Sequence, residues 1–240
     1  MAKRGGTKHV KRLATPKAVP IKDKKASTWI LRTSPGPHPN RASIGLGVLL
    51  RDVLKVAPTL KEVKQILNSQ NPRLVKIDDS PRTDARYPVG IMDVIRFESA
   101  DKNYRIVVDS KGRLSPLEIN KGEANHKILK VVGKNVLKGG KISLALHDGR
   151  NLISDNHVKV GDSIVVSLPE VKMTKHLKLE KGSRCLIREG KHAGSIVKLM
   201  EIIPRKAGKA SEALVQSKED GEFITVAKYL FVVDDSFKTQ

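Results

Sequence analysis

The residues that could support phosphate or nucleotide chemistry do not complete a motif in this 240-residue sequence. Gly140-Lys141 would need a glycine at Asn135 and a serine or threonine at Ile142 to form a phosphate-binding loop, and it has neither. Gly45-Leu46-Gly47 is not a dinucleotide-binding turn, because Leu50 occupies the position of the third glycine. The sequence also shows no set of a nucleophile, a general base and a group to orient the base, as a catalytic site would require. The sequence therefore predicts a protein that is not an enzyme and that has no cofactor.

The seven histidines and the single cysteine do not indicate a metal site. No histidine has a partner at the spacing of a metal-binding motif, and Cys185 alone can form neither an internal disulfide nor a multi-cysteine zinc site. A reducing cytoplasm fits this composition. His147 adjoins a predicted hairpin turn, where we expect it to be exposed. His38 and His192 are candidates for contact with a phosphate or a base.

The charge of the chain points to a polyanionic partner. There are 46 Lys and Arg against 25 Asp and Glu, which gives a net charge of +21. Nucleic acid is the first candidate, and an anionic membrane surface is the second. The membrane is disfavoured because no apolar run approaches 18 residues and no apolar segment of a signal peptide follows the basic start. Aromatic residues make up only 3%, too few to stack single-stranded bases, so we expect recognition of folded RNA.

Two adjacent helices are predicted to position part of this charge. In Leu46–Ala57 the apolar residues, Leu54 among them, repeat at helical spacing and leave Arg51 and Lys55 on the opposite side. Pro58, which lacks an N–H, is expected to end this helix.

The second helix begins with a capping signal. Thr59 and Glu62 have the spacing at which a hydroxyl and a carboxylate each satisfy a free backbone N–H. The apolar stripe is Leu60, Val63, Ile66 and Leu67. The opposite face carries Lys61, Lys64, Gln65 and Asn68. The two helices are therefore expected to present a basic surface.

After the helices the pattern changes to that of β-strands. Residues 74–77 and 92–97 are strand-like, and Asp78–Pro81 has the composition of a turn. The segments LLRDVLK, LKEVKQIL and VKIDDSPRTDARYPVGIMDVI resemble the helix-hairpin RNA-binding domain of the S4e family of small-subunit ribosomal proteins. The resemblance covers essentially the whole chain and implies that the helix hairpin grips structured RNA.

Residues 1–41 form a basic segment. Eleven Lys and Arg stand against Asp23 alone, and five prolines with three glycines prevent long regular elements. One interpretation is a solvated or nuclear-targeting tail, and the other is an extended arm that becomes ordered on rRNA. We favour the arm, because an RNA-binding domain follows and because the opening residues also resemble the S4e family.

From Lys102 onward the sequence predicts β-structure. Turn glycines precede apolar strands repeatedly, and Asp93 and Asp162, which follow such glycines, are interpreted as turn carboxylates. The segment KGSRCLIREGKHAGSIVKLMEI resembles the KOW motif of ribosomal proteins and elongation factors, whose loop contacts RNA or protein. Here the loop spans residues 188–195, and its tip is expected to expose Lys191 and His192.

The combined prediction is an α+β, multi-domain protein. The domains are a basic N-terminal arm (1–42), a helix-hairpin domain with a small antiparallel sheet (43–105), a β-rich central domain (106–171) and an SH3-like KOW β-barrel (172–240). The expected partners are small-subunit rRNA and neighbouring ribosomal proteins in the cytoplasm, with no membrane and no homo-oligomer. An RNA-modifying enzyme and a KOW-type transcription or translation factor remain as alternatives.

The predicted RNA-binding residues are basic or imidazole side chains of the arm, the helix hairpin, the strand and turn that follow it, and the glycine-containing loop. They are Lys3, Arg4, Lys8, Lys11, Arg12, Arg51, Lys55, Lys61, Lys64, Lys76, Arg82, Arg86, Lys191 and His192.

Overall fold

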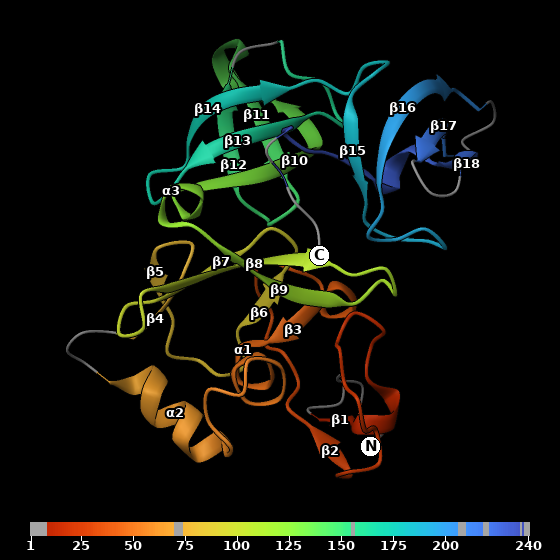
Figure 1. The fold of residues 1–240 in the computed structure, drawn as a ribbon. Helices are drawn as coiled ribbons and strands as arrows, with labels where there is room; N and C mark the ends of the chain where they lie inside the picture. Colours follow the sequence, from red (N-terminus) through yellow and green to blue (C-terminus); the bar gives the residue numbers. More distant parts are fainter. Residues whose placement is uncertain are drawn as a thin grey trace, which may run out of the picture.

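The computed structural model describes residues 9–69, 74–154, 157–205, 210–217, 221–235 and 237. These residues are mostly β: three five-stranded and two two-stranded antiparallel sheets are joined by short helices (Figure 1). The sequence favours this outcome because its apolar segments are short and are separated by turn residues. The α+β prediction therefore holds only in part.

The described part of the predicted arm packs on the body of the protein. Strand β1 (Val10–Lys11) pairs with β2 (Trp29–Ile30), and the turn-like segments η1 (Arg12–Ala14) and η2 (Asn40–Ala42) flank this pair. Ile21 and Ile30 are buried in the main hydrophobic core. This segment is therefore anchored by apolar contacts and is not a free extended arm.

The first helix of the hairpin ends earlier than predicted. It consists of α1 (Leu46–Val48) followed by η3 (Leu49–Val53), a π-helical turn in which the Leu54 N–H donates to the Leu49 carbonyl at 2.9 Å. Lys55 then takes a positive φ of 53°, which stops the helix before Pro58. The prediction that Pro58 ends the helix was wrong, and Leu54 is only half-buried.

The second helix, α2 (Leu60–Asn68), forms as the sequence predicts. The Thr59 hydroxyl accepts a hydrogen bond from the Glu62 N–H at 3.3 Å, and Val63 and Leu67 are buried. The opposite face is exposed at Lys61, Lys64, Gln65 and Asn68.

The N-terminal sheet has the order β5-β4-β7-β8-β9. Its strands are β4 (Val75–Ile77), β5 (Ser80–Pro81), β7 (Val94–Phe97), β8 (Lys102–Val108) and β9 (Leu114–Ile119). Beside it, β3 (Ser43–Gly45) pairs with β6 (Pro88–Gly90). The predicted boundary between residues 105 and 106 falls inside β8, which pairs with β7 and β9 on either side.

The central sheet has the order β12-β11-β10-β13-β14 and follows the short helix α3 (Lys121–Ala124). Its strands are β10 (His126–Val136), β11 (Ile142–Leu146), β12 (Asn151–Ser154), β13 (Ser163–Ser167) and β14 (Lys172–Leu177). Strands β10 and β11 form an antiparallel hairpin, with a short turn η4 (Lys138–Gly140) at its end. The predicted boundary after residue 171 separates β14 from β13, its hydrogen-bonded partner.

The C-terminal sheet has the order β18-β17-β16-β15-β19 and is curled into a half-barrel (Figure 1). Its strands are β15 (Arg184–Ile187), β16 (Ile196–Ile203), β17 (Glu212–Ser217), β18 (Gly221–Val226) and β19 (Leu230–Val232), the last preceded by η5 (Ala227–Tyr229). Within the described residues β18 and β19 are the two edges of this sheet, so the ladder does not close into the predicted barrel.

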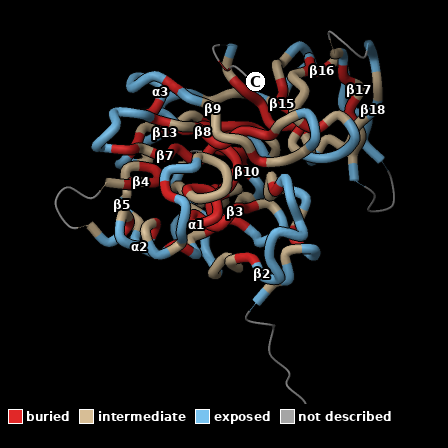
Figure 2. Tube along the Cα trace, turned by 60° about the horizontal axis from the view of Figure 1, so that its bottom comes forward, coloured by how far each residue is buried: buried red, intermediate tan, exposed pale blue. Residues whose placement is uncertain are grey.

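The three sheets share one main core. Its buried residues come from the N-terminal segment, the helix hairpin and the N-terminal sheet, together with Ile128 of β10, Leu186 of β15, and Phe231 and Phe237 near the C-terminus. The buried trace forms a continuous band through the middle of the molecule (Figure 2). The central and C-terminal sheets each add a smaller core of their own.

Candidate nucleic-acid interface

Five of the predicted RNA-binding lysines are exposed and form no ion pair with any described residue. They are Lys11, Lys55, Lys61, Lys64 and Lys191. Two of them share the exposed face of α2, which packs through its apolar stripe on the first helical turn. An exposed lysine ammonium retains its hydration and can exchange it for contact with a phosphate.

Other predicted cations are held by carboxylates of the protein. Arg51 donates from both Nε and a terminal nitrogen to Asp52, each at 2.9 Å, and this hydrogen bonding raises the pKa of Arg51. Arg12 also approaches Asp52, at 3.9 Å, and links the N-terminal segment to the helix hairpin. Lys76 pairs with Glu98 at 2.7 Å on the N-terminal sheet. These three cations therefore stabilise local structure as well as contributing positive charge.

Arg82 and Arg86 lie in the turn between β5 and β6. The Arg82 guanidinium lies 4.6 Å from the centroid of the Tyr87 ring, a cation–π arrangement. The Nε atom of Arg86 donates to the carbonyl oxygen of Arg32 at 3.1 Å, which joins this turn to the N-terminal segment. Arg86 itself is exposed, so its guanidinium can still reach a ligand.

The glycine-containing loop between β15 and β16 has the predicted backbone but not both predicted side chains at its surface. Gly190 and Gly194 take φ values of 108° and 87°, which glycine adopts without strain. Lys191 is exposed, but the His192 ring stacks on Phe223 with centroids 4.1 Å apart. The expectation that His192 projects from the tip was therefore wrong.

The remaining predicted contacts, Lys3, Arg4 and Lys8, lie outside the described residues.

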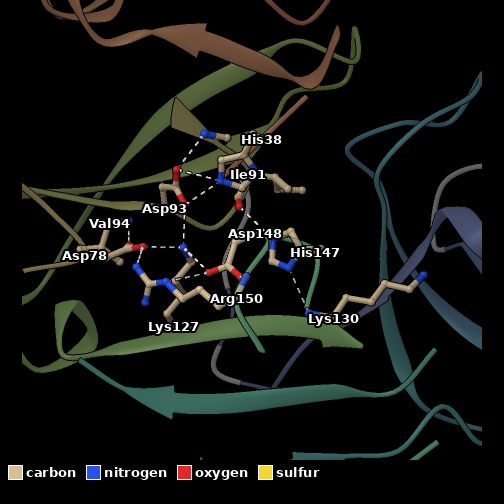
Figure 3. Close-up of polar contacts among 11 residues, drawn as sticks. His38, Asp78, Ile91, Asp93, Val94, Lys127, Lys130, His147, Asp148 and Arg150 are labelled. Atoms are coloured by element: carbon tan, nitrogen blue, oxygen red, sulfur yellow. Dashed lines mark hydrogen bonds and ion pairs between the residues drawn. The ribbon is translucent and has the colours of Figure 1, made fainter. Parts of the chain in front are cut away.

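A buried ionic cluster, absent from the sequence-based prediction, joins the N-terminal and central sheets. Lys127 of β10 is fully buried, and its Nζ lies 2.6 Å from Asp78, 2.6 Å from Asp93 and 3.4 Å from Asp148 (Figure 3). Arg150 adds a second cation, 2.9 Å from Asp78 and 3.4 Å from Asp148. The carboxylates come from two turns of the N-terminal sheet and one of the central sheet, so the cluster fastens these sheets together.

The charged groups of the cluster shift the pKa values of their neighbours. Burial by itself would raise the pKa of Asp93, but Lys127, His38 and the Gly90 N–H hold that pKa far below its usual value. Burial would likewise lower the pKa of Lys127, but the carboxylates outweigh it and raise that pKa. The pKa of Asp78 lies above its ordinary value, because burial raises it more than Lys127 lowers it.

Two histidines occupy the side of this cluster, and both depart from their predicted roles. His38 is buried, and its Nε2 lies 3.0 Å from Asp93, so it is not free to contact a phosphate or base. His147 is not simply exposed: its Nδ1 accepts from the Lys130 N–H at 3.2 Å and its Nε2 donates to the Ile91 carbonyl at 3.2 Å. Burial lowers the pKa of His147 to about 3, which keeps the ring neutral.

The turn roles of Asp93 and Asp162 are confirmed. Asp93 accepts from the Gly90 N–H at 2.8 Å, and Asp162 accepts from the Lys159 N–H at 2.9 Å. The sequence also holds a signal for Lys127 that the prediction missed. Alternation along β10 places Lys127 on the same face as Leu129 and Val131, both fully buried.

Two features are absent from the residues that the structure describes. No group of three or more His, Cys, Asp and Glu side chains among them is placed to hold a metal ion. No helix among them has both the length and the apolar character needed to cross a membrane.

Comparisons with known proteins show the family. The model of the ribosomal family S4e matches residues 100–173, and that of the RS4NT (NUC023) domain matches residues 4–41. The small ribosomal subunit protein eS4 of Methanosphaera stadtmanae is 41% identical over 233 residues, which is 97% of this chain and 95% of the relative. The protein of the same name from Methanothermobacter thermautotrophicus is 36% identical over the same shares. This chain belongs to the S4e family of ribosomal proteins.

A solved structure agrees with this assignment. The 30S ribosomal protein S4e from Thermoplasma acidophilum matches with a TM-score of 0.69 at 32% identity, covering 81% of this chain and 96% of that one. S4e membership makes this chain a structural protein of the small ribosomal subunit and not an enzyme, so the alternative of an RNA-modifying enzyme was wrong.

Proposed function

We propose that this S4e protein binds small-subunit rRNA directly, chiefly through the exposed face of α2, and that it supports assembly of the subunit. The observation that carries the proposal is the pair Lys61 and Lys64: both are exposed on one helix face, and neither pairs with a described carboxylate. Phosphates of an rRNA backbone can therefore contact these ammonium groups without breaking an ion pair of the protein.

The N-terminal segment extends this contact. Its exposed lysines, Lys11 among them, lie on a segment anchored by Ile21 and Ile30, so the positive charge is held in place before binding. Affinity then comes from release of the cations condensed on phosphates, and the rigid hairpin fixes the register on one rRNA fold. Lys191 adds a contact from the loop of the C-terminal half-barrel, which we interpret as an SH3-like KOW module.

The proposed setting is the cytoplasmic ribosome, with small-subunit rRNA and neighbouring ribosomal proteins as partners. Cosedimentation with small subunits tests this. The protein should remain with the subunits at moderately high salt, and the Lys61→Ala, Lys64→Ala double variant should be released at lower salt than the Gln65→Ala, Asn68→Ala double variant, its control on the same face. Equal release of the two double variants would contradict the assigned role of α2.

A further inference from the structure

A cleft of about 460 Å³ opens where the N-terminal segment meets all three five-stranded sheets. It is lined by the N-terminal segment, the turn between β8 and β9, His147 of the central sheet and the loop between β15 and β16. Its volume lies within the range of roughly 300 to 1,000 Å³ that is typical of clefts for small ligands. Nothing proposed above for the helix hairpin uses this cleft.

Much of the cleft surface is apolar. Ile91, Val108, Leu114 and Ala193 line it, and each is buried in the main core or packed at its edge. His147 adds an uncharged imidazole whose two nitrogens are already hydrogen-bonded within the protein. A flat, weakly polar group can therefore enter without leaving the ring nitrogens of His147 unpaired.

Cations surround this apolar surface. Lys17 and Arg41 are exposed cleft residues of the N-terminal segment, and the guanidinium of Arg188 is a third cation, paired with Glu189 at 2.7 Å. The Nε atom of Arg188 is buried and has no hydrogen-bond acceptor among the described residues. The lining thus carries three cations and only one carboxylate. The buried Nε donor of Arg188 is also still available, and both features suit an anionic ligand.

The cleft is held in shape by close packing of its walls. A Cβ atom on Gly194 would lie 2.4 Å from the Asp109 carbonyl oxygen, so the loop between β15 and β16 rests directly on the turn between β8 and β9. The Lys17 ammonium in turn lies near Gly112 of the same turn. Figure 1 shows this loop beside the turn between β8 and β9. This contact fixes two walls of the cleft relative to each other.

We propose that this cleft receives one unstacked nucleotide of rRNA, with its base against the apolar lining and its phosphates on Lys17, Arg41 and Arg188. The flat face of the base matches the apolar lining, and the negative charge of the phosphates matches the three cations. Unpaired bases are the usual target of sequence-specific RNA recognition. This inference rests on the proposed rRNA binding and adds a second, nucleotide-selective site to it.

Two pairs of matched variants test the cleft in the full-length protein, with binding to small-subunit rRNA and base-specific chemical footprinting as readouts. Ala42→Phe fills the cleft from η2, and Ala26→Phe makes the same change at an exposed position outside it. Lys17→Ala with Arg41→Ala removes two cleft cations, and Lys138→Ala with Lys141→Ala removes two exposed cations that do not line the cleft and have no proposed contact with rRNA.

In the wild type we expect a single unpaired base to be protected as a discrete site. Both cleft variants should lose that protection while the rest of the footprint remains, and Ala42→Phe should bind about 10-fold more weakly, as for loss of one stacked base. Both controls should keep the protection. A cleft variant that protects the same bases as its control overturns the inference. Absence of rRNA binding by the wild type would instead overturn the proposed function.

Discussion

Lys127 shows how one buried side chain can join two parts of a protein. It lies on β10 of the central sheet, but two of its three carboxylate partners, Asp78 and Asp93, belong to turns of the N-terminal sheet. Taking ions out of water is costly unless each finds a partner of opposite charge, so the members of this cluster depend on one another.

Replacement of Lys127 with methionine, which has a similar shape and no charge, should destabilise the protein strongly. The change leaves three buried carboxylates with Arg150 as the remaining strong cation, and we expect a loss of about 3 to 5 kcal/mol in the free energy of unfolding. Urea denaturation measures this loss. Lys138→Met, at an exposed lysine of the η4 turn, should stay within about 0.5 kcal/mol of the wild type.

Lys130 should make the stability of the protein depend on alkaline pH. Its Nζ donates to the carbonyls of Lys228 and Leu230, and burial lowers its pKa to about 8. Between pH 8 and the unfolded value of about 10.5, the unfolded chain binds more protons at this lysine than the folded protein does. The contribution of Lys130 to the free energy of unfolding should therefore increase as the pH rises from 8 to about 10.5.

A comparison with Lys130→Met isolates this effect. Burial raises the pKa of the Cys185 thiol to about 11, so the cysteine acts in the opposite direction over part of the same window. The difference in unfolding free energy between the wild type and Lys130→Met should thus grow in favour of the wild type as pH increases from 8 to 10.5. A constant difference would show that Lys130 has an ordinary pKa.

At the scale of elements, the loop between β15 and β16 is fixed by the close approach of Gly194 to the turn at Asp109. Gly194→Ala should cost the strain of a positive φ, about 1 to 3 kcal/mol, and in addition the displacement of the Asp109 backbone. Gly139→Ala is the matched control, because Gly139 has a φ of 79° with open space around its Cβ position. Equal thermal destabilisation of the two variants would contradict the packing of the loop on that turn.

The helix α2 separates binding from stability within one element. Lys64→Ala should weaken binding to the cognate rRNA fragment by about 1 to 2 kcal/mol while changing the free energy of unfolding by less than about 0.5 kcal/mol. Leu67→Ala, on the buried face, should instead cost about 2 to 5 kcal/mol of stability. Binding assays and denaturation of the same two variants test both statements, and a Lys64→Ala variant that unfolds would contradict the assigned faces.

At the scale of the whole molecule, a net charge of +21 is distributed over a fold whose three sheets share one core. The N-terminal segment contributes to both properties, because its lysines are exposed while Ile21, Ile30 and His38 are buried. Deletion of residues 1–42 would therefore remove core residues together with charge. Substitution in place tests the charge alone.

Replacing Lys22, Lys24 and Lys25 with glutamine should lower the salt dependence of rRNA binding. If all three contact phosphates, the slope of log affinity against log salt should decrease by about 2, at roughly 0.7 to 0.9 per contact. Titrations between about 50 and 200 mM salt measure this slope. An unchanged slope would show that these exposed lysines make no phosphate contacts.

The sequence by itself determined the features that depend on local chemistry. The charge of the chain follows from composition, and the start of α2 follows from the reach of the Thr59 hydroxyl to a backbone N–H three residues away. The turns at Gly190 and Gly194 follow from the absence of a Cβ atom. Each of these signals acts within a few residues, so it can be read along the chain.

Only the tertiary structure decided which distant groups meet. The π-helical turn at η3 ends the first helix before Pro58. Strand β8 pairs with β9 across the boundary predicted after residue 105, and β14 pairs with β13 across the boundary predicted after residue 171. The cluster around Lys127 brings together carboxylates that lie 21 to 49 residues from Lys127 along the sequence. Hydrogen bonds and ion pairs of this kind depend on distance in space, which the spacing of residues along the sequence does not contain.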